Sequence, residues 1–193
     1  HDRYRRQRQM CIRDSHSVIH YRDAYGLYAC NGILFNHESP RRGVNFVTKK
    51  IVQGLVRIKQ GKQKVLTLGN LYSRRDWGHA NDYVESMWKI LQQKKANDFV
   101  VATKTSNSVK DFINICAKKL NIKLIWKNKG LKEIAINKLT NKIIIKVDQK
   151  YFRETEVDNL IGDFSKAKKM LKWKPKYSFD KLIDDMIYDE LND

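Results

Sequence analysis

A pair of arginines in a polar segment is the first feature of the sequence that could do chemistry. Arg41 and Arg42 belong to residues 36–43, NHESPRRG, which follow an apolar run at 32–35 and precede a helical pattern that begins near Asn45. Guanidinium groups pair with phosphate oxygens through parallel N–H donors. Because an α/β fold binds ligands where strands end and helices begin, we interpret the segment as a phosphate-binding loop between a buried strand and a helix. An ordinary solvated turn with two basic residues is the alternative.

Residues 74–83, RRDWGHANDY, form a second segment of this kind. Its Arg-Asp pair before an aromatic residue could direct Arg75 toward a phosphate. Asp82 is expected to cap the N-terminus of the helix that follows. A plain entry from a loop into a helix would have the same composition.

Two further segments supply a charge pair and a lysine. Arg153 and Glu156 lie three residues apart in 151–158, YFRETEVD, and offer a cation for phosphate and a carboxylate for the N–H edge of guanine. Without other signals, such a pair is more often a surface ion pair. In 45–50, NFVTKK, apolar side chains could flank a ring while a lysine reaches a phosphate, although the same string suits the first turn of an amphipathic helix.

The charge of the chain narrows the class of protein. Its 193 residues carry 39 Lys and Arg against 21 Asp and Glu, a formal net charge of +18, which would ordinarily favour a nucleic-acid binder. The lysines are spread along the whole chain, however, and no helix-turn-helix, zinc-finger or RNP-type string concentrates them. A basic protein that binds a phosphorylated small molecule explains the charge equally well.

Cysteine spacing and hydropathy indicate a soluble chain in a reducing compartment. Cys11, Cys30 and Cys116 form no CxxC pair, which argues against a disulfide framework and a structural zinc site. No apolar run approaches the roughly 20 residues that cross a membrane, and no secretory segment is present. We therefore expect no metal, no membrane contact and a cytoplasmic location.

Strand and helix patterns alternate along the chain and predict the α/β class. Gly26 is expected to stop a helix over 17–25, and Ser108 with Asp111 predicts a capping box. Strands are expected at 27–35, 64–68, 99–102, 124–126 and 142–148 (the last at an edge or half-buried), and helices at 45–58, 81–93, 108–120, 165–171 and 178–191. The sequence contains no GxGxxG or GxxGxxG string, so it resembles the back half of a dinucleotide-binding fold.

The start of the chain differs in composition from the rest. Residues 1–15 hold five arginines and no lysine, and they show neither helical nor strand periodicity. A basic arm for nucleic acid is one interpretation. We favour a non-native leader over 1–16 and assign the fold to residues 17–193.

Taken in this order, NHESPRRG, RDWGHA and FRETEVD make residues 17–193 resemble the GDP-mannose 4,6-dehydratase family of extended short-chain dehydrogenase/reductases. The strings YRDAYGLYACNGILF and KAKKMLKWKPKYSFDKLI extend the resemblance to both ends. It implies the back part of a Rossmann-type NAD(P)-binding fold, interleaved with a smaller carboxyl-terminal substrate-binding domain. It also implies NADP as cofactor, GDP-mannose as substrate, and a homotetramer or homodimer at full length.

The resemblance assigns roles to matched positions. His37 and Arg42, with Arg41, resemble the family's NADP contacts, and the arginine loop is implied to reach a neighbouring subunit's cofactor. The positions that resemble contacts to the GDP part of the substrate are Asn36, Val47, Lys50, Arg75, Arg153 and Glu156. Lys104 stands where the family has a glycine, which leaves the conformation of that loop open.

The implied reaction begins with hydride transfer from C4 of the mannose to NADP. The C5 proton then becomes acidic, water leaves from C6, and the hydride returns to C6. The family's Tyr-x-x-x-Lys pair and its Thr and Glu acid/base residues lie upstream of Ser17, so we assign no catalytic residue and expect this portion alone to be inactive. Another nucleotide-sugar dehydratase or epimerase of the same superfamily is the nearest alternative, and a basic nucleic-acid-binding protein is the alternative from a different class.

Overall fold

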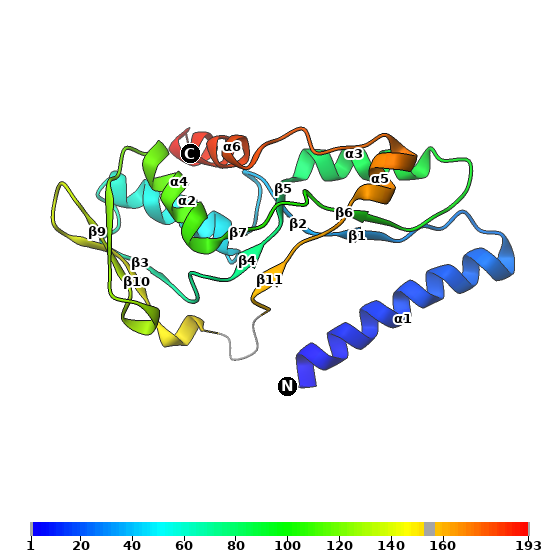
Figure 1. The fold of residues 1–193 in the computed structure, drawn as a ribbon, viewed down its shortest axis with the longest axis horizontal. Coiled ribbons are helices and arrows are strands. Elements are labelled where there is room, and N and C mark those ends of the chain that lie inside the picture. The colour runs from blue at the N-terminus through cyan, green and yellow to red at the C-terminus, as the bar shows by residue number, and fades with distance from the viewer. Residues whose placement is uncertain (1, 153–156, 193) are drawn as a thin grey trace.

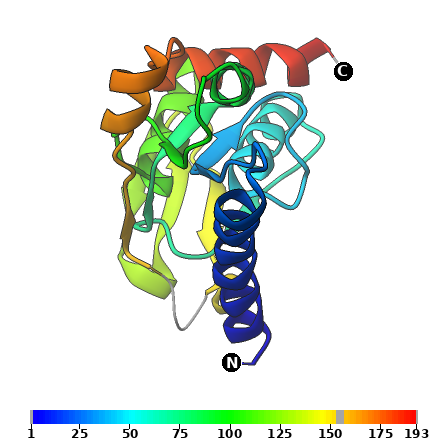
Figure 2. The same ribbon diagram turned by 90° about the vertical axis from the view of Figure 1, so that its right-hand side faces the viewer.

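Short strands in parallel and antiparallel pairs alternate with helices, which confirms the predicted α/β class (Figures 1 and 2). The computed structural model describes residues 2–152 and 157–192. The elements form three groups, which are a four-stranded sheet with three helices, a two-stranded sheet with two helices, and short strands that join them. In Figure 1 the first group lies at the left and the second at the right.

The larger sheet has the strand order β3-β10-β9-β8. Its strands are β3 (Leu66–Leu68), β8 (Leu124–Lys127), β9 (Ile134–Asn137) and β10 (Ile143–Val147), and η1 (Gly130–Lys132) links β8 to β9. β10 pairs in parallel with β3 and antiparallel with β9, so of the two predicted placements, edge or half-buried, the half-buried one is confirmed. A register shift between Ile143 and Ile145 disturbs the alternation. Consequently the consecutive side chains of Ile144 and Ile145 are both buried.

Three helices pack on this sheet and form the main hydrophobic core. They are α2 (Val47–Lys59), α4 (Val109–Lys119) and α6 (Phe179–Asn192). Ile51 and Leu55 lie one turn apart on α2 and are fully buried, as are Phe112 of α4 and Met186 of α6. Burial of each such side chain contributes about 1.5–3 kcal/mol. The core therefore fixes the N-terminus of α2, beside the NHESPRRG segment.

The smaller group pairs two parallel strands with two helices. It contains β1 (Gly32–Leu34), β6 (Phe99–Val101), α3 (Ala80–Leu91) and α5 (Ser165–Leu171). Both helices and β6 lie where the sequence predicted them. β1 is shorter than the predicted strand over 27–35 and is not buried, since Ile33 is 52% exposed. The reason is that β1 pairs with β6 alone among the described strands.

Short strands join the two groups. They are β2 (Asn36–Glu38), β4 (Arg74–Arg75), β5 (Trp77–His79), β7 (Asn107–Ser108) and β11 (Asn159–Leu160), with η2 (Gln149–Tyr151) before the last. β2 pairs in parallel with β5, and β4 lies between β11 and β7. The expectation that residues 36–43 are all loop was therefore wrong for the first three, because their backbone groups bond to β5 despite their polar side chains.

A long helix, α1 (Asp2–Tyr25), projects from the body of the structure (Figure 1). It ends where predicted, and Gly26 follows it with a φ of +66°. It begins well before residue 17, however, in a stretch to which we assigned no periodicity. A mostly polar helix such as this one need not carry a clear apolar stripe in its sequence. Arg22 ties α1 to the rest of the fold through an ion pair of 2.9 Å with Asp98.

One of the two predicted helix caps is confirmed. The Ser108 hydroxyl accepts a hydrogen bond from the Asp111 amide, and the Asp111 carboxylate accepts one from the Ser108 amide. The predicted cap at Asp82 was wrong, because His79 occupies the N-cap of α3. The Asp82 carboxylate instead accepts hydrogen bonds of 3.0 Å from the amides of Lys176 and Tyr177, and so joins α3 to the segment before α6.

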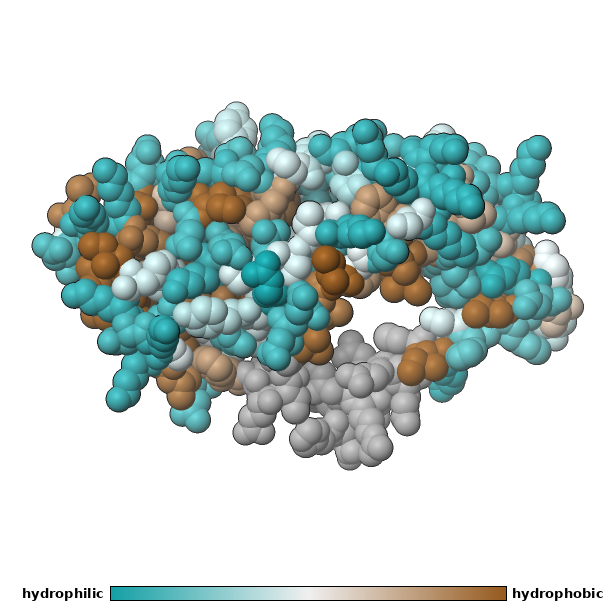
Figure 3. All heavy atoms as spheres, viewed as in Figure 1, coloured by the Kyte–Doolittle hydropathy of each residue, from teal (hydrophilic) through white to brown (hydrophobic). Residues whose placement is uncertain are grey.

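Cys30 and Cys116 are free thiols. Cys116 is fully buried in the core, and this burial raises the pKa of its thiol to about 12. Cys30 is half-buried. Within residues 2–152 and 157–192, no helix combines the length and the apolar character needed to span a bilayer. The surface carries apolar patches among hydrophilic side chains (Figure 3).

Candidate functional site

A cavity of about 350 Å³ lies between β2, the start of α2 and the segments around β3 and β4. We call it the β2–α2 cavity. Five of the nine predicted site residues line it, namely Asn36, Arg42, Val47, Lys50 and Arg75. Its wall also contains Glu38, Phe46, Ser73 and Tyr151. The sequence positions of these residues span more than a hundred residues, so the fold brings together groups that the sequence keeps apart.

β2 divides its three side chains between two sides of the sheet. Asn36 and Glu38 line the cavity, whereas the ring of His37 lies 5.2 Å from that of Tyr83. Nδ1 of His37 is 2.9 Å from the carbonyl oxygen of Phe35. Because a carbonyl only accepts, Nδ1 carries the proton, and in the neutral ring Nε2 is an acceptor. His37 and Arg42, both predicted as cofactor contacts, therefore lie on different sides of β2.

A buried carboxylate holds Arg42 at the cavity. Glu38 is 2% exposed, and its Oε2 accepts a hydrogen bond of 2.5 Å from the Thr48 hydroxyl. The same oxygen lies 3.0 Å from Nε of Arg42, whose guanidinium stacks 3.5 Å from the centre of the Phe46 ring. Burial raises the pKa of Glu38, while the Thr48 hydroxyl and the Arg42 charge oppose that rise. The planar group of Arg42 is thus fixed from two directions.

The adjacent lysines of α2 have different surroundings. Lys49 is buried and its Nζ lies 2.9 Å from Glu190 and 3.6 Å from Asp189, both at the end of α6. Lys50 instead lines the cavity, with Nζ 3.9 Å from the centre of the Tyr151 ring. Within the described residues no carboxylate forms an ion pair with Lys50. Its charge is therefore available to an anionic ligand in the cavity.

Arg75 is held at the cavity by backbone groups. Its Nη1 donates to the carbonyl oxygens of Arg74 and Val157, at 2.8 and 2.6 Å. The next residue, Asp76, is fully buried. Its carboxylate accepts hydrogen bonds from the amides of Lys104 and Gly162 and from the amide and hydroxyl of Thr103, and it thereby fixes the segment that carries Arg75.

Lys104 adopts a backbone conformation that glycine adopts more readily than other residues. Lys104 has a φ of +62°, in the left-handed region, although it has a side chain. Its amide donates a hydrogen bond of 2.9 Å to the Asp76 carboxylate. The buried carboxylate therefore stabilises a turn that the sequence left open.

Two predicted substrate contacts, Arg153 and Glu156, lie outside the described residues. Tyr151, two positions before Arg153, lines the cavity at the end of η2. Their assignment stays a prediction.

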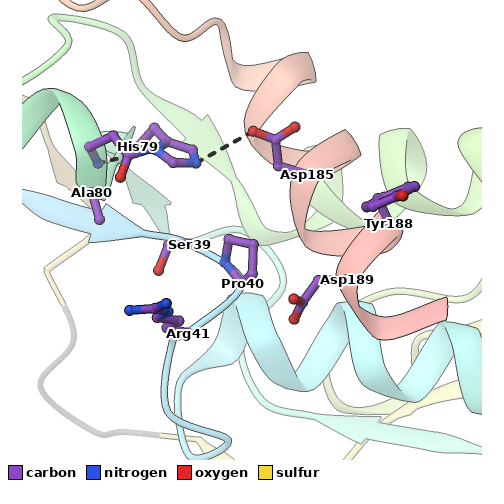
Figure 4. A pocket seen from close by; sticks show the side chains of 9 residues that line it. Ser39, Pro40, Arg41, His79, Ala80, Asp185, Tyr188 and Asp189 are labelled. Carbon is purple, nitrogen blue, oxygen red and sulfur yellow. Dashed lines mark hydrogen bonds and ion pairs between the residues drawn. The ribbon is translucent and has the colours of Figure 1, made fainter. Parts of the chain in front are cut away.

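Arg41 lines a different hollow from Arg42. This α6 pocket, of about 600 Å³, is lined by Ser39, Pro40, Arg41, His79, Ala80, Asn81, Asp185, Tyr188 and Asp189. In Figure 4 Arg41 comes from the segment after β2, and Asp185 and Asp189 come from α6 across the pocket. The paired arginines therefore do not form one phosphate fork.

His79 lines the α6 pocket and caps α3. Its Nδ1 accepts a hydrogen bond of 3.1 Å from the Asn81 amide, and its ring stacks on Tyr177 with centroids 4.0 Å apart. Nε2 lies 3.6 Å from Asp185 (Figure 4). Burial lowers the pKa of His79 and the charge of Lys181 adds to this, while Asp185 and Asp82 oppose it.

We expect the free energy of unfolding to fall on acidification through His79. A histidine whose pKa is lower in the folded chain stabilises it fully above the unfolded pKa of about 6.5, and this contribution is lost as pH falls through the folded pKa. Protonation of Nδ1 also removes the acceptor that caps α3. The expected loss is about 1 kcal/mol between pH 7 and pH 5, measured by urea unfolding.

His79→Asn keeps a capping oxygen without a titrating ring, and it should remove this part of the pH dependence. His16→Asn, on the exposed surface of α1, is the control and should leave the dependence unchanged. An equal slope in the parent and in His79→Asn would contradict the assignment.

Sequence reasoning missed Glu38 and Ser73 as functional candidates. Glu38 sits four residues before Arg42, a spacing that could have signalled the ion pair. No sequence pattern marks Ser73, because its place at the cavity depends on how β3, β4 and α4 pack around it.

Known proteins similar to this chain in sequence belong to one family. The model of the family described as GDP-mannose 4,6 dehydratase matches residues 12–186. GDP-mannose 4,6 dehydratase from Dictyostelium discoideum is 50% identical over 170 residues, which are 88% of this chain and 48% of that protein. GDP-mannose 4,6 dehydratase 1 from Arabidopsis thaliana is 53% identical over 174 residues, 90% of this chain and 44% of that protein. The chain thus spans a little under half the length of these relatives.

A solved structure shows the same fold at low identity. The structure of RMD from Pseudomonas aeruginosa complexed with NADPH superposes with a TM-score of 0.75 at 16% identity, covering 93% of this chain and 53% of that one. The agreement confirms the predicted fold, which is the back part of a Rossmann-type architecture.

Proposed function

Because the chain belongs to the GDP-mannose 4,6-dehydratase family, we propose that it is the nucleotide-sugar-binding portion of an enzyme that dehydrates GDP-mannose. The product is GDP-4-keto-6-deoxymannose, on the route to GDP-fucose and related deoxysugars. The observation that carries the proposal is the convergence of Asn36, Arg42, Val47, Lys50 and Arg75 on one cavity. The sequence alone selected these positions, some by their chemistry and some by resemblance, and a chance resemblance would not require them to meet.

The cavity offers the groups that a nucleoside diphosphate needs. Lys50 and Arg75 bring positive charge to its wall, which suits the two phosphates. Phe46, Val47 and Tyr151 supply apolar surface for a ring, and the Asn36 amide can both donate and accept. Binding here holds the sugar in a fixed orientation relative to the rest of the enzyme, which is how remote contacts contribute to catalysis.

We also propose that the nicotinamide cofactor of the enzyme is NADP, an anion that Arg42 and His37 would contact from different sides of β2. Arg42 offers a guanidinium already fixed by Glu38 and Phe46, and the Nε2 acceptor of His37 suits a hydroxyl or amide donor. NADP, when bound, supplies the hydride acceptor and donor of the reaction. Arg41 lies on the α6 pocket, and we propose that it contacts the cofactor from across a subunit interface of a homodimer or homotetramer.

The division of the chain remains part of the proposal. Residues 17–193 would hold the Rossmann remainder and the substrate-binding domain. The free thiols of Cys30 and Cys116 support a cytoplasmic location.

Calorimetric titration of the 193-residue chain with GDP, UDP, dTDP and a single-stranded oligonucleotide tests the proposal. We expect GDP to bind at least about tenfold more tightly than the other two nucleotides, because one bidentate contact to guanine contributes about 1–3 kcal/mol. Equal binding of UDP or dTDP would favour another nucleotide-sugar enzyme. Tight binding of the oligonucleotide without binding of GDP would favour the nucleic-acid alternative.

A further inference from the structure

A buried hydroxyl in the β2–α2 cavity lacks a partner within the described structure. Ser73 is 2% exposed, and its Oγ makes no hydrogen bond with any residue that the structure describes. Ser73 is also one of the residues that line the cavity. Ser86, another buried serine, donates its hydroxyl to the carbonyl oxygen of Tyr83 at 2.6 Å, as buried hydroxyls normally do.

The backbone around Ser73 is held by hydrogen bonds to α4, which fixes the position of this residue at the cavity wall. The carbonyl oxygen of Ser73 accepts a hydrogen bond of 3.2 Å from the amide of Val109, and that of Leu71 accepts one of 2.8 Å from Lys110. Both donors belong to the first turn of α4. The segment before β4 is thus attached to a helix that is itself part of the main core.

Ser73 and Arg75 are two residues apart and both line the cavity, whereas Arg74 between them points to the other side. Arg74 donates to the carbonyl oxygen of Ser106 and lies 3.6 Å from Asp111. The alternation is that of an extended strand. It places an unpaired hydroxyl on the same wall as a guanidinium.

We propose that Ser73 is a ligand-binding residue whose hydroxyl donates to a phosphoryl oxygen of a nucleoside diphosphate held by Lys50 and Arg75. The inference rests on the proposed function and deepens it. A phosphoryl oxygen accepts from O–H donors without being able to donate, and the neighbouring cations favour its negative charge. A buried polar group without a hydrogen-bond partner is unusual in a folded protein. A bound ligand would supply the acceptor that the Ser73 hydroxyl lacks among the described residues.

Ser73→Ala tests the proposal, because it removes one oxygen and changes little else. We expect GDP to bind about 5- to 20-fold more weakly by calorimetry, while guanosine, which has no phosphate, binds as in the parent. The melting temperature should stay the same or rise, since a buried hydroxyl without a partner is lost.

Ser86→Ala is the matched control. It should lower the melting temperature, because a satisfied buried hydrogen bond is removed, and should leave GDP affinity unchanged. Ser73→Ala is therefore expected to change GDP affinity without lowering the melting temperature, and Ser86→Ala to lower the melting temperature without changing GDP affinity.

Three results would count against the assignment. If Ser73→Ala binds GDP as the parent does, Ser73 is not a ligand contact, while the proposed function stands. If guanosine and GDP lose affinity equally, the hydroxyl does not bind a phosphate. If the parent itself fails to bind GDP, the proposed function falls, and the phosphate assignment with it.

Discussion

Replacement of Lys50 by alanine is expected to weaken GDP binding about 10- to 100-fold. The lysine lines the β2–α2 cavity and has no acidic partner among the described residues, so its whole charge can act on a phosphate. A hydrogen bond to a charged group contributes about 1.5–3 kcal/mol, which corresponds to this range of affinity. Calorimetric titration at two salt concentrations measures the effect, and the variant should also show a weaker dependence on salt.

Lys50→Arg and Lys59→Ala are the controls for this experiment. The first retains the charge and should recover most of the affinity. The second removes an exposed lysine from the last turn of the same helix and should leave affinity unchanged. Equal losses in Lys50→Ala and Lys59→Ala would mean that the effect reflects overall charge and not a specific contact.

Asp76→Asn is expected to lower the free energy of unfolding by about 3–4 kcal/mol. The carboxylate accepts four hydrogen bonds while fully buried, two on each oxygen. An amide group in its place turns an NH₂ toward two donors, and each unsatisfied buried group costs about 1–3 kcal/mol. For a chain of this length the melting temperature should fall by about 10 °C, which differential scanning calorimetry can measure.

Asp163→Asn provides the comparison. Asp163 accepts hydrogen bonds from the amide and hydroxyl of Ser165 and is exposed to solvent. Loss of its charge should cost well under half as much as the Asp76 change. A loss at Asp76 of less than about 1 kcal/mol would show that water replaces the carboxylate, and that the Lys104 turn does not depend on it.

The fold could be predicted from the sequence where local signals agree with tertiary packing. The helix from Ser108 has its capping box, and α2 has an apolar stripe that meets the core. The errors came where neighbours decide the outcome. The polar residues of β2 form a strand because β5 lies beside them, and Asp82 leaves the helix cap because the backbone near Tyr177 competes for its carboxylate.

The sequence predicted some of the residues that line the candidate site but not how they are arranged. Resemblance selected five residues that share the β2–α2 cavity. It treated Arg41 and Arg42 as one unit, whereas Glu38 pairs with Arg42 and the backbone directs Arg41 to the α6 pocket. Distant segments build the cavity wall around Ser73, and for this reason Ser73 was not identified, whereas the spacing of Glu38 and Arg42 could have revealed their ion pair.

The three residues of β2 have a consequence for how such a protein can evolve. Asn36 and Glu38 belong to one chemical compartment, and His37 between them belongs to another. A mutation at 36 or 38 is therefore under selection for what fills the β2–α2 cavity, whereas one at 37 is under selection for what lies beyond the opposite face. The two sides of β2 can therefore change independently, although the residues concerned are consecutive in the sequence.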